Sequence, residues 1–240
     1  MKDHIHYNSE LASRRWFGYF DLLGVTQLYK TRNQISIFVA FSRAIEKFRE
    51  RATAWPNIGY AWFSDTFILY TEDDSAVSFG AIDNISRWFF YFLITADIPV
   101  RGAISCDVLY ADKENDLFFG EAFIEAYQYG EIQDWIGLLL CPSAEQRLQE
   151  VGLPAERRLN YAYADVPFNN RHERQPNDLK GKLPVCILGN WISVNNKNPV
   201  IERLTGMRER ITDQKIRTKY DRAIEFIQKN RRVLASEMNR

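Results

Sequence analysis

Apolar and amphipathic stretches alternate along the first part of the chain and predict its first elements. The apolar run at 16–23 predicts a buried strand. Over 26–52, apolar residues recur at helical spacing with charged residues between them, which predicts a long amphipathic helix. Aromatic residues dominate 58–72 and predict a β-hairpin that turns near Ser64 and Asp65.

The next stretch repeats the same alternation of helix and strand. Ser75 is suited to cap a helix that must stop before Pro99. Apolar runs at 100–110 and 117–119 predict two strands, and a third helix is expected over 121–129. The resulting order β, α, β, β, α, β predicts an α+β fold with a ferredoxin-like βαββαβ core, an antiparallel sheet with helices on one face.

The remainder of the chain divides into a polar segment and a helical tail. Residues 165–183 are rich in Pro and Asn and predict an exposed loop. Apolar residues at helical spacing from about residue 200 predict C-terminal helices. We therefore expect an N-terminal extension (1–15), one main domain (16–195) and a C-terminal helical appendage (196–240).

Composition limits the possible partners. The 240 residues are 46% hydrophobic, enough for one sizeable core, and 31 basic residues balance 31 acidic ones. This balance predicts no nucleic-acid partner and no attraction to a membrane surface. The longest apolar run, 88–96, is too short to span a bilayer, and no secretory signal is expected. Three widely spaced cysteines fit a reducing, cytoplasmic location.

Two aspartates are the candidates for chemistry. Asp21 lies near the end of the first strand and Asp65 lies in the predicted hairpin turn, so both carboxylates can meet on neighbouring strands. Either aspartate alone is more often a turn or cap residue. Together, each flanked by phenylalanine, they would bury uncompensated charge unless a cation binds there. We predict Asp21 and Asp65 as catalytic metal ligands for two divalent cations, Mg²⁺ or Mn²⁺.

Four motifs around these aspartates resemble those of the class III nucleotidyl cyclases. Asp21 and Asp65 match the family's two metal positions, the strand at 101–105 looks like its R-x-G-I strand, and the segment 119–127 looks like the start of its Y-x-G-x-x-V-N-x-A helix. The resemblance covers about 16–135. In detail it is most similar to the compact bacterial pyrimidine cyclases of the Pycsar antiphage system, which make cyclic UMP or cyclic CMP.

The resemblance implies a function. It implies conversion of UTP to 3′,5′-cyclic UMP and pyrophosphate by a two-metal mechanism, as second-messenger synthesis in antiphage defence, by a homodimer with composite active sites. The turn after Asp21 precedes a helix N-terminus, where backbone N–H groups bind phosphate. The Leu22 carbonyl is a candidate metal ligand, and the phosphate candidates are Leu23, Gly24, Val25, Thr26 and Arg101. Arg101 has the alternative of pairing with a surface carboxylate.

Departures from the family pattern indicate which nucleotide base the site would bind. Purine cyclases read adenine with a lysine four residues before the second metal aspartate and an aspartate three before the helix glycine. Ala61 and Leu117 occupy those positions, so an ATP cyclase of the usual type is disfavoured. The neighbouring Tyr60 has a hydroxyl suited to a pyrimidine, although strand alternation would point it away from Asp65. We predict Tyr60, Ala61 and Leu117 as base-binding positions, with core or interface packing as the alternative for Tyr60.

Two further departures leave other functions open. The family's transition-state asparagine and arginine fall on Ile124 and Gln128, neither of which can stabilise the same charge. Either another cation such as Arg101 substitutes, or turnover is slow. The alternatives are a cytidylate or purine nucleotide cyclase, and a catalytically silent nucleotide-binding or scaffold domain with the cyclase fold.

Overall fold

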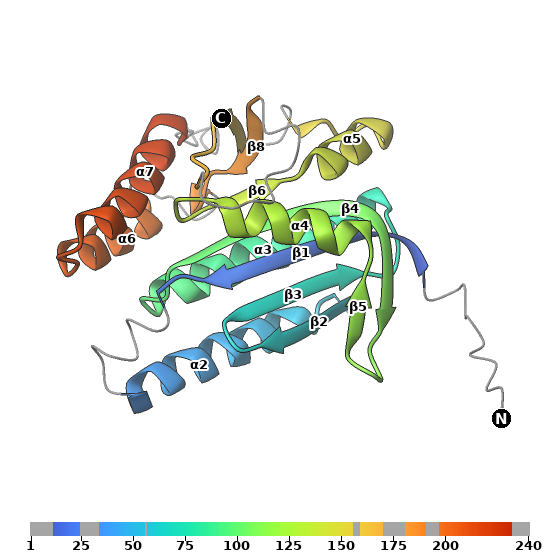
Figure 1. Ribbon diagram of the computed structural model, residues 1–240, viewed down its shortest axis with the longest axis horizontal. Helices are drawn as coiled ribbons and strands as arrows, with labels where there is room; N and C mark the ends of the chain where they lie inside the picture. The colour runs from blue at the N-terminus through green and yellow to red at the C-terminus, as the bar shows by residue number, and fades with distance from the viewer. Residues whose placement is uncertain are drawn as a thin grey trace, which may run out of the picture.

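The computed structural model describes residues 12–24, 34–55, 57–155, 159–169, 181–190 and 197–231. One mixed sheet with helices on both faces forms the body of these ranges (Figure 1). The strands are β1 (Ala12–Leu22), β2 (Ile58–Phe63), β3 (Thr66–Thr71), β4 (Val100–Asp112), β5 (Leu117–Phe119), β6 (Leu138–Leu140), β7 (Tyr161–Ala164) and β8 (Leu183–Cys186). The helices are α2 (Gln34–Ala52), α3 (Ala76–Thr95), α4 (Glu121–Ile132), α5 (Pro142–Glu150), α6 (Pro199–Glu209) and α7 (Gln214–Asn230).

The sheet topology confirms the predicted fold class. The strand order is β2-β3-β1-β4-β6-β8-β7, with β5 paired to β4. All pairings of these strands are antiparallel except β4 with β6. The chain order β1-α2-β2-β3-α3-β4 contains the predicted β, α, β, β, α, β sequence. The hairpin and the helix capped by Ser75, whose side chain accepts from the Ser78 N–H, are also confirmed.

One feature of the predicted architecture is wrong. Helices cover both faces of the sheet, with α2 and α3 on one side and α4 on the other (Figure 1). Alternate residues of β1 explain this, because Phe20 belongs to the core under α3 while Phe17 and Tyr19 pack with α4. A strand that is apolar on both faces requires cover on both. The strand also starts earlier than expected, at Ala12.

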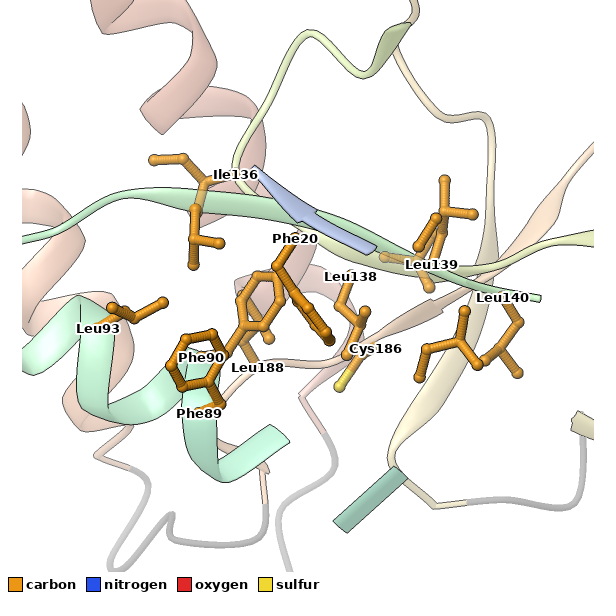
Figure 2. Packing of buried hydrophobic residues seen from close by; sticks show 14 of the residues in the cluster. Phe20, Phe89, Phe90, Leu93, Ile136, Leu138, Leu139, Leu140, Cys186 and Leu188 are labelled. Atoms are coloured by element: carbon orange, nitrogen blue, oxygen red, sulfur yellow. The ribbon is translucent and has the colours of Figure 1, made fainter. Parts of the chain in front are cut away.

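The main core lies between the sheet and α3. Figure 2 shows Phe20 close to Phe89 and Phe90, and their ring centroids are 5.8 and 5.7 Å from that of Phe20. The consecutive leucines of β6, with Cys186 and Leu188, extend this core across the sheet (Figure 2). Each fully buried side chain of this size contributes about 2 kcal/mol to stability. This core therefore fixes the positions of β1 and β4, which carry the candidate site.

The C-terminal helices join the same core. Trp135 packs against Phe226 of α7, with ring centroids 5.3 Å apart, and Leu204 of α6 is fully buried. The boundary expected at residue 196 stays a prediction, as does the exposed loop, because 170–180 lies outside the described residues. Cys106, Cys141 and Cys186 are buried free thiols. Among the helices described here, none combines the length and the apolar character needed to cross a membrane.

Candidate active site

Strand register brings the two predicted aspartates together. Asp21 lies near the end of β1, opposite Thr66 of β3 on one side and Arg101 of β4 on the other. Asp65 lies in the turn between β2 and β3. The Leu22 backbone N–H donates to the Asp65 carbonyl oxygen at 2.9 Å, which fastens that turn to the end of β1. Both carboxylates therefore belong to the same edge of the sheet.

The turn that carries Asp65 has an unusual backbone. Ser64 has a φ of 53°, in the left-handed region, which costs an L-residue roughly 1 kcal/mol. The Trp62 indole N–H donates to the Ser64 carbonyl oxygen at 2.7 Å and holds the turn in place. Two-residue hairpin loops favour turns with a positive φ, so this backbone is what the tight turn requires. This turn fixes where Asp65 sits relative to β1.

Arg101 is the direct partner of Asp21. Its Nε donates to Asp21 Oδ2 at 2.7 Å, and its Nη2 donates to Glu131 Oε2 at 3.1 Å. Its Nη1 donates to the carbonyl oxygens of Glu131 and, at 2.8 Å, of Gln133. These carbonyls lie at the C-terminal end of α4, where the helix dipole favours a cation. The expectation that Asp21 would carry uncompensated charge without a metal is therefore wrong, because Arg101 compensates it.

Negative charge nevertheless exceeds positive charge in this cluster. Asp21 and Arg101 are only 13% and 12% exposed, and the carboxylates of Glu131 and Asp65 lie close enough to act on Asp21. Burial raises the pKa of Asp21 to about 6; the Arg101 guanidinium opposes this, and the charges of Glu131 and Asp65 add to it. The cluster thus holds three carboxylates and one guanidinium, and the surplus of negative charge favours binding of a further cation.

The donor set fits a hard divalent cation. Within the described ranges, no group of three or more His, Cys, Asp and Glu side chains is arranged to hold a metal ion. A site here would thus depend on Asp21 and Asp65, and Mg²⁺ is commonly bound by one or two carboxylates together with substrate phosphates and water. The hydrogen bond that Asp21 accepts from Arg101 uses Oδ2, so Oδ1 is the oxygen suited to a cation. The predicted Leu22 carbonyl lies beside it in the chain.

The predicted phosphate-binding turn is only partly described. The Leu23 backbone N–H donates to the Pro99 carbonyl oxygen at 2.8 Å, so it is not available to a phosphate and this prediction is corrected. Gly24 has a φ of +69°, a conformation that glycine adopts without strain, as the predicted turn requires. Val25 and Thr26 lie outside the described residues.

The three predicted base-binding positions are not brought together. Ala61 pairs with Ile68, which pairs with Tyr19, so Ala61 shares the face of the sheet that carries Asp21. Tyr60 lies on the opposite face, where its ring is 5.0 Å from that of Phe48 in α2. That position makes Tyr60 a core side chain and separates it from Asp21.

Leu117 lies in a different region of the sheet. It pairs with Asp112 at the far end of β4, whereas Arg101 lies at the start of that strand, and it is 47% exposed. At about 3.3 Å per residue, Arg101 and Asp112 are roughly 36 Å apart along β4. Ile124 of α4 is 53% exposed and apolar, as the sequence implied for the place of the transition-state asparagine.

Sequence reasoning missed two members of the site. Glu131 holds Arg101, and the Tyr19 hydroxyl donates to Glu131 Oε1 at 2.8 Å. Tyr19 carried a usable signal, because it lies two residues before Asp21 and therefore on the same face of β1. Glu131 carried none, since its position depends on how α4 returns across the sheet.

Comparison with known proteins identifies the fold. No protein-family profile and no curated protein matches the sequence. Among solved structures, the guanylyl cyclase domain of the RhoGC fusion protein from the aquatic fungus Blastocladiella emersonii has a TM-score of 0.53 at 11% identity, over 73% of this chain and 95% of that one.

Two further solved structures agree with this match. The guanylate cyclase domain of RhGC from Catenaria anguillulae, in complex with GTP, gives 0.50 at 12% identity over 72% and 95% of the two chains. An adenylate cyclase from Trypanosoma brucei gives 0.52 at 11% over 72% and 89%. This protein therefore has the fold of a nucleotidyl cyclase catalytic domain.

Proposed function

We propose that this protein is a pyrimidine nucleotide cyclase that converts UTP to 3′,5′-cyclic UMP and pyrophosphate. The observation that carries the proposal is the meeting of Asp21 and Asp65 at one edge of the sheet, with more negative charge than Arg101 neutralises. When bound, two divalent cations, Mg²⁺ or Mn²⁺, would lower the pKa of the ribose 3′-hydroxyl and neutralise charge on the triphosphate. Asp21 and Asp65 hold and orient these cations in the proposal.

The choice of a pyrimidine rests on what the base would meet. Ala61 and Leu117 have no polar side-chain atom, so neither can hydrogen-bond the edge of adenine. A site that hydrogen-bonds the polar edge of a base rejects a base that leaves the site's own polar groups unpaired. At positions 61 and 117 this chain has no such polar side-chain groups. The resemblance to the Pycsar-type cyclases, which make cyclic UMP or cyclic CMP, supports a pyrimidine substrate, the antiphage role and the cytoplasmic location. UTP is the pyrimidine that we propose.

A homodimer follows from the separation of the proposed parts. Leu117, which pairs with Asp112, lies roughly 36 Å along β4 from Arg101, so one chain cannot use both ends of this strand around a single nucleotide. A second copy can supply the end that carries Leu117 to the aspartates of the first. The exposed apolar side chains Val108, Leu117 and Phe119 toward that end of β4, and Ile124 of α4, suit such a contact.

The test is a nucleotide panel. The purified protein is incubated with Mn²⁺ and each of ATP, GTP, CTP and UTP, and cyclic products are identified by chromatography and mass spectrometry. The expected result is cyclic UMP from UTP, abolished in Asp65→Ala. No cyclic product, or product from ATP alone, would refute the proposal.

A catalytically silent nucleotide-binding domain is the second candidate. It is favoured by Ile124, an exposed apolar side chain where the resemblance places the transition-state asparagine, and by Gln128 in place of the arginine. The same panel separates the two candidates, because a silent domain would bind a nucleotide without turnover and Asp65→Ala would not change that binding.

A further inference from the structure

A chain of hydrogen bonds connects α4 to the aspartate pair. The Tyr19 hydroxyl donates to Glu131 Oε1 at 2.8 Å, and Arg101 Nη2 donates to Glu131 Oε2 at 3.1 Å. Arg101 Nε then donates to Asp21 Oδ2 at 2.7 Å. Both carboxylate oxygens of Glu131 are thus engaged, and this side chain cannot turn without breaking a hydrogen bond.

Packing holds the first member of this chain in place. Gly130 lies over the Tyr19 ring, and a Cβ at Gly130 would come within 2.5 Å of Tyr19 Cδ1. The Tyr127 ring packs edge-on against Tyr19, with centroids 5.4 Å apart. The glycine therefore lets α4 approach β1 closely enough for the Tyr19 hydroxyl to reach Glu131.

The position of Glu131 determines how the charge of Arg101 is shared. The guanidinium lies between the carboxylates of Asp21 and Glu131, and the carbonyl oxygens of Glu131 and Gln133 hold its third nitrogen. If Glu131 were neutral, the attraction of Arg101 would act mainly on Asp21. A cation approaching Asp21 would then have to compete with the whole of that attraction.

We propose that Glu131 is a positioning residue of the divalent-cation site, which shares the Arg101 guanidinium with Asp21 and so keeps Asp21 able to bind a divalent cation. The inference rests on the proposed function for the identity of that site. Glu131 touches neither cation nor nucleotide in this role and acts through Arg101, while Tyr19 fixes the orientation of Glu131. Groups that orient the ligands of a metal typically change its affinity about 10–100-fold when removed.

The test is a titration of the full chain with Mn²⁺ in the absence of nucleotide. Electron paramagnetic resonance of the free Mn²⁺ measures the binding affinity. Glu131→Gln keeps the size and a hydrogen-bond acceptor but removes the charge, and we expect about tenfold weaker binding. Tyr19→Phe removes the hydroxyl's hydrogen bonds with Glu131 and Thr66 and should weaken binding about fivefold. Matched controls that should bind as the wild type does are Glu150→Gln, which breaks a contact with Arg147, and Tyr163→Phe, which breaks a Tyr–Glu pair with Glu145.

A double-mutant cycle separates action through Arg101 from direct action of the Glu131 charge. In an Arg101→Gln background, Glu131→Gln should no longer weaken Mn²⁺ binding. Wild-type affinity in the Glu131→Gln single variant, or an equal loss in both backgrounds, would overturn the proposal. If melting curves show that Arg101→Gln does not fold, the Tyr19→Phe and Glu131→Gln pair replaces it. Non-additive losses of Mn²⁺ binding free energy then support action of Tyr19 through Glu131, and additive losses overturn the proposal.

Parallel assays with UTP distinguish failure of this inference from failure of the proposed function. If the wild-type protein forms no cyclic product, the proposed function is refuted. A loss of Mn²⁺ affinity in Glu131→Gln would still support the positioning role of Glu131. A wild-type protein that forms cyclic UMP but binds no Mn²⁺ without nucleotide overturns this inference and leaves the function standing. In an active enzyme, Glu131→Gln should lower kcat/KM at limiting Mn²⁺ and recover at saturating Mn²⁺, whereas a variant that only unfolds would not recover.

Discussion

Two Asp–Arg pairs in this protein use the same residue types and differ in charge balance. Asp83 and Arg87 lie one turn apart on α3, with side chains 2% and 8% exposed. Arg87 donates from Nε to Asp83 Oδ1 at 3.2 Å and from Nη2 to Oδ2 at 3.1 Å, and the Tyr161 hydroxyl donates to Oδ1 at 2.7 Å. This pair satisfies both carboxylate oxygens within the protein.

The pair of Asp21 and Arg101 is arranged differently. It joins two strands, Arg101 reaches Asp21 through one oxygen, and Glu131 and Asp65 add further negative charge. A balanced buried pair holds elements in place, here α3 against β7. A pair with surplus negative charge can still bind a cation. The contrast indicates which of the two buried networks is built for a ligand.

The largest expected effect is on catalysis. Asp65→Asn alters one of the two proposed cation ligands and should lower the proposed cyclisation of UTP by about a thousandfold or more, since the cations would supply several kcal/mol of transition-state stabilisation. Its melting temperature should stay close to that of the wild type, because Asp65 lies in a partly exposed turn. Initial rates and thermal melting curves check both statements. A rate above one tenth of wild type would place the cation site elsewhere.

Asp83→Asn should show the opposite pattern. The variant leaves the buried Arg87 guanidinium without its carboxylate, and breaking a buried pair in this way costs about 4 kcal/mol of unfolding free energy. The rate per folded molecule should be unchanged. Urea unfolding measures the first effect, and a loss below about 1 kcal/mol would contradict this account of the α3 pair.

A pH titration sharpens the contrast at Asp21. Its pKa is raised from the ordinary 3.8 to about 6, mainly by burial, so between these values the folded protein holds a proton that the unfolded chain has released. Stability therefore falls as the pH rises through this window, by about 2–3 kcal/mol relative to Asp21→Asn. Urea unfolding between pH 4 and 7 measures the difference, and Mn²⁺ at pH 7 should recover part of it. Parallel curves for the two proteins would contradict a raised pKa.

The smallest expected effects come from two tyrosine hydroxyls. Tyr161→Phe removes a buried hydrogen bond to Asp83 and should cost about 1 kcal/mol of stability without changing Mn²⁺ affinity. Tyr19→Phe should weaken Mn²⁺ binding as described above. Melting curves and Mn²⁺ titrations of both variants test this, and identical behaviour would show that the two networks do not differ in kind.

Local pattern was sufficient for the order of elements in the first half of the chain. The hairpin turn at Ser64 and the cap at Ser75 follow from residues adjacent in sequence, and both were predicted. Placement of helices on the two faces was predicted incorrectly, because the apolar run of β1 is continuous and does not reveal which face each helix covers. Alternation did suggest that Tyr60 points away from Asp65, and in the structure Tyr60 lies on the face of the sheet opposite Asp21.

The sequence by itself determined that Asp21 lies near a strand end, that Asp65 lies in a hairpin turn, and that these two aspartates can meet. Only the tertiary structure decided that Arg101, 80 residues from Asp21 along the chain, pairs with it. It also decided that Glu131, 30 residues further on, shares that guanidinium. The reason is physical: strand register and the return of α4 over the sheet depend on packing of the whole core, which no local pattern of residues specifies.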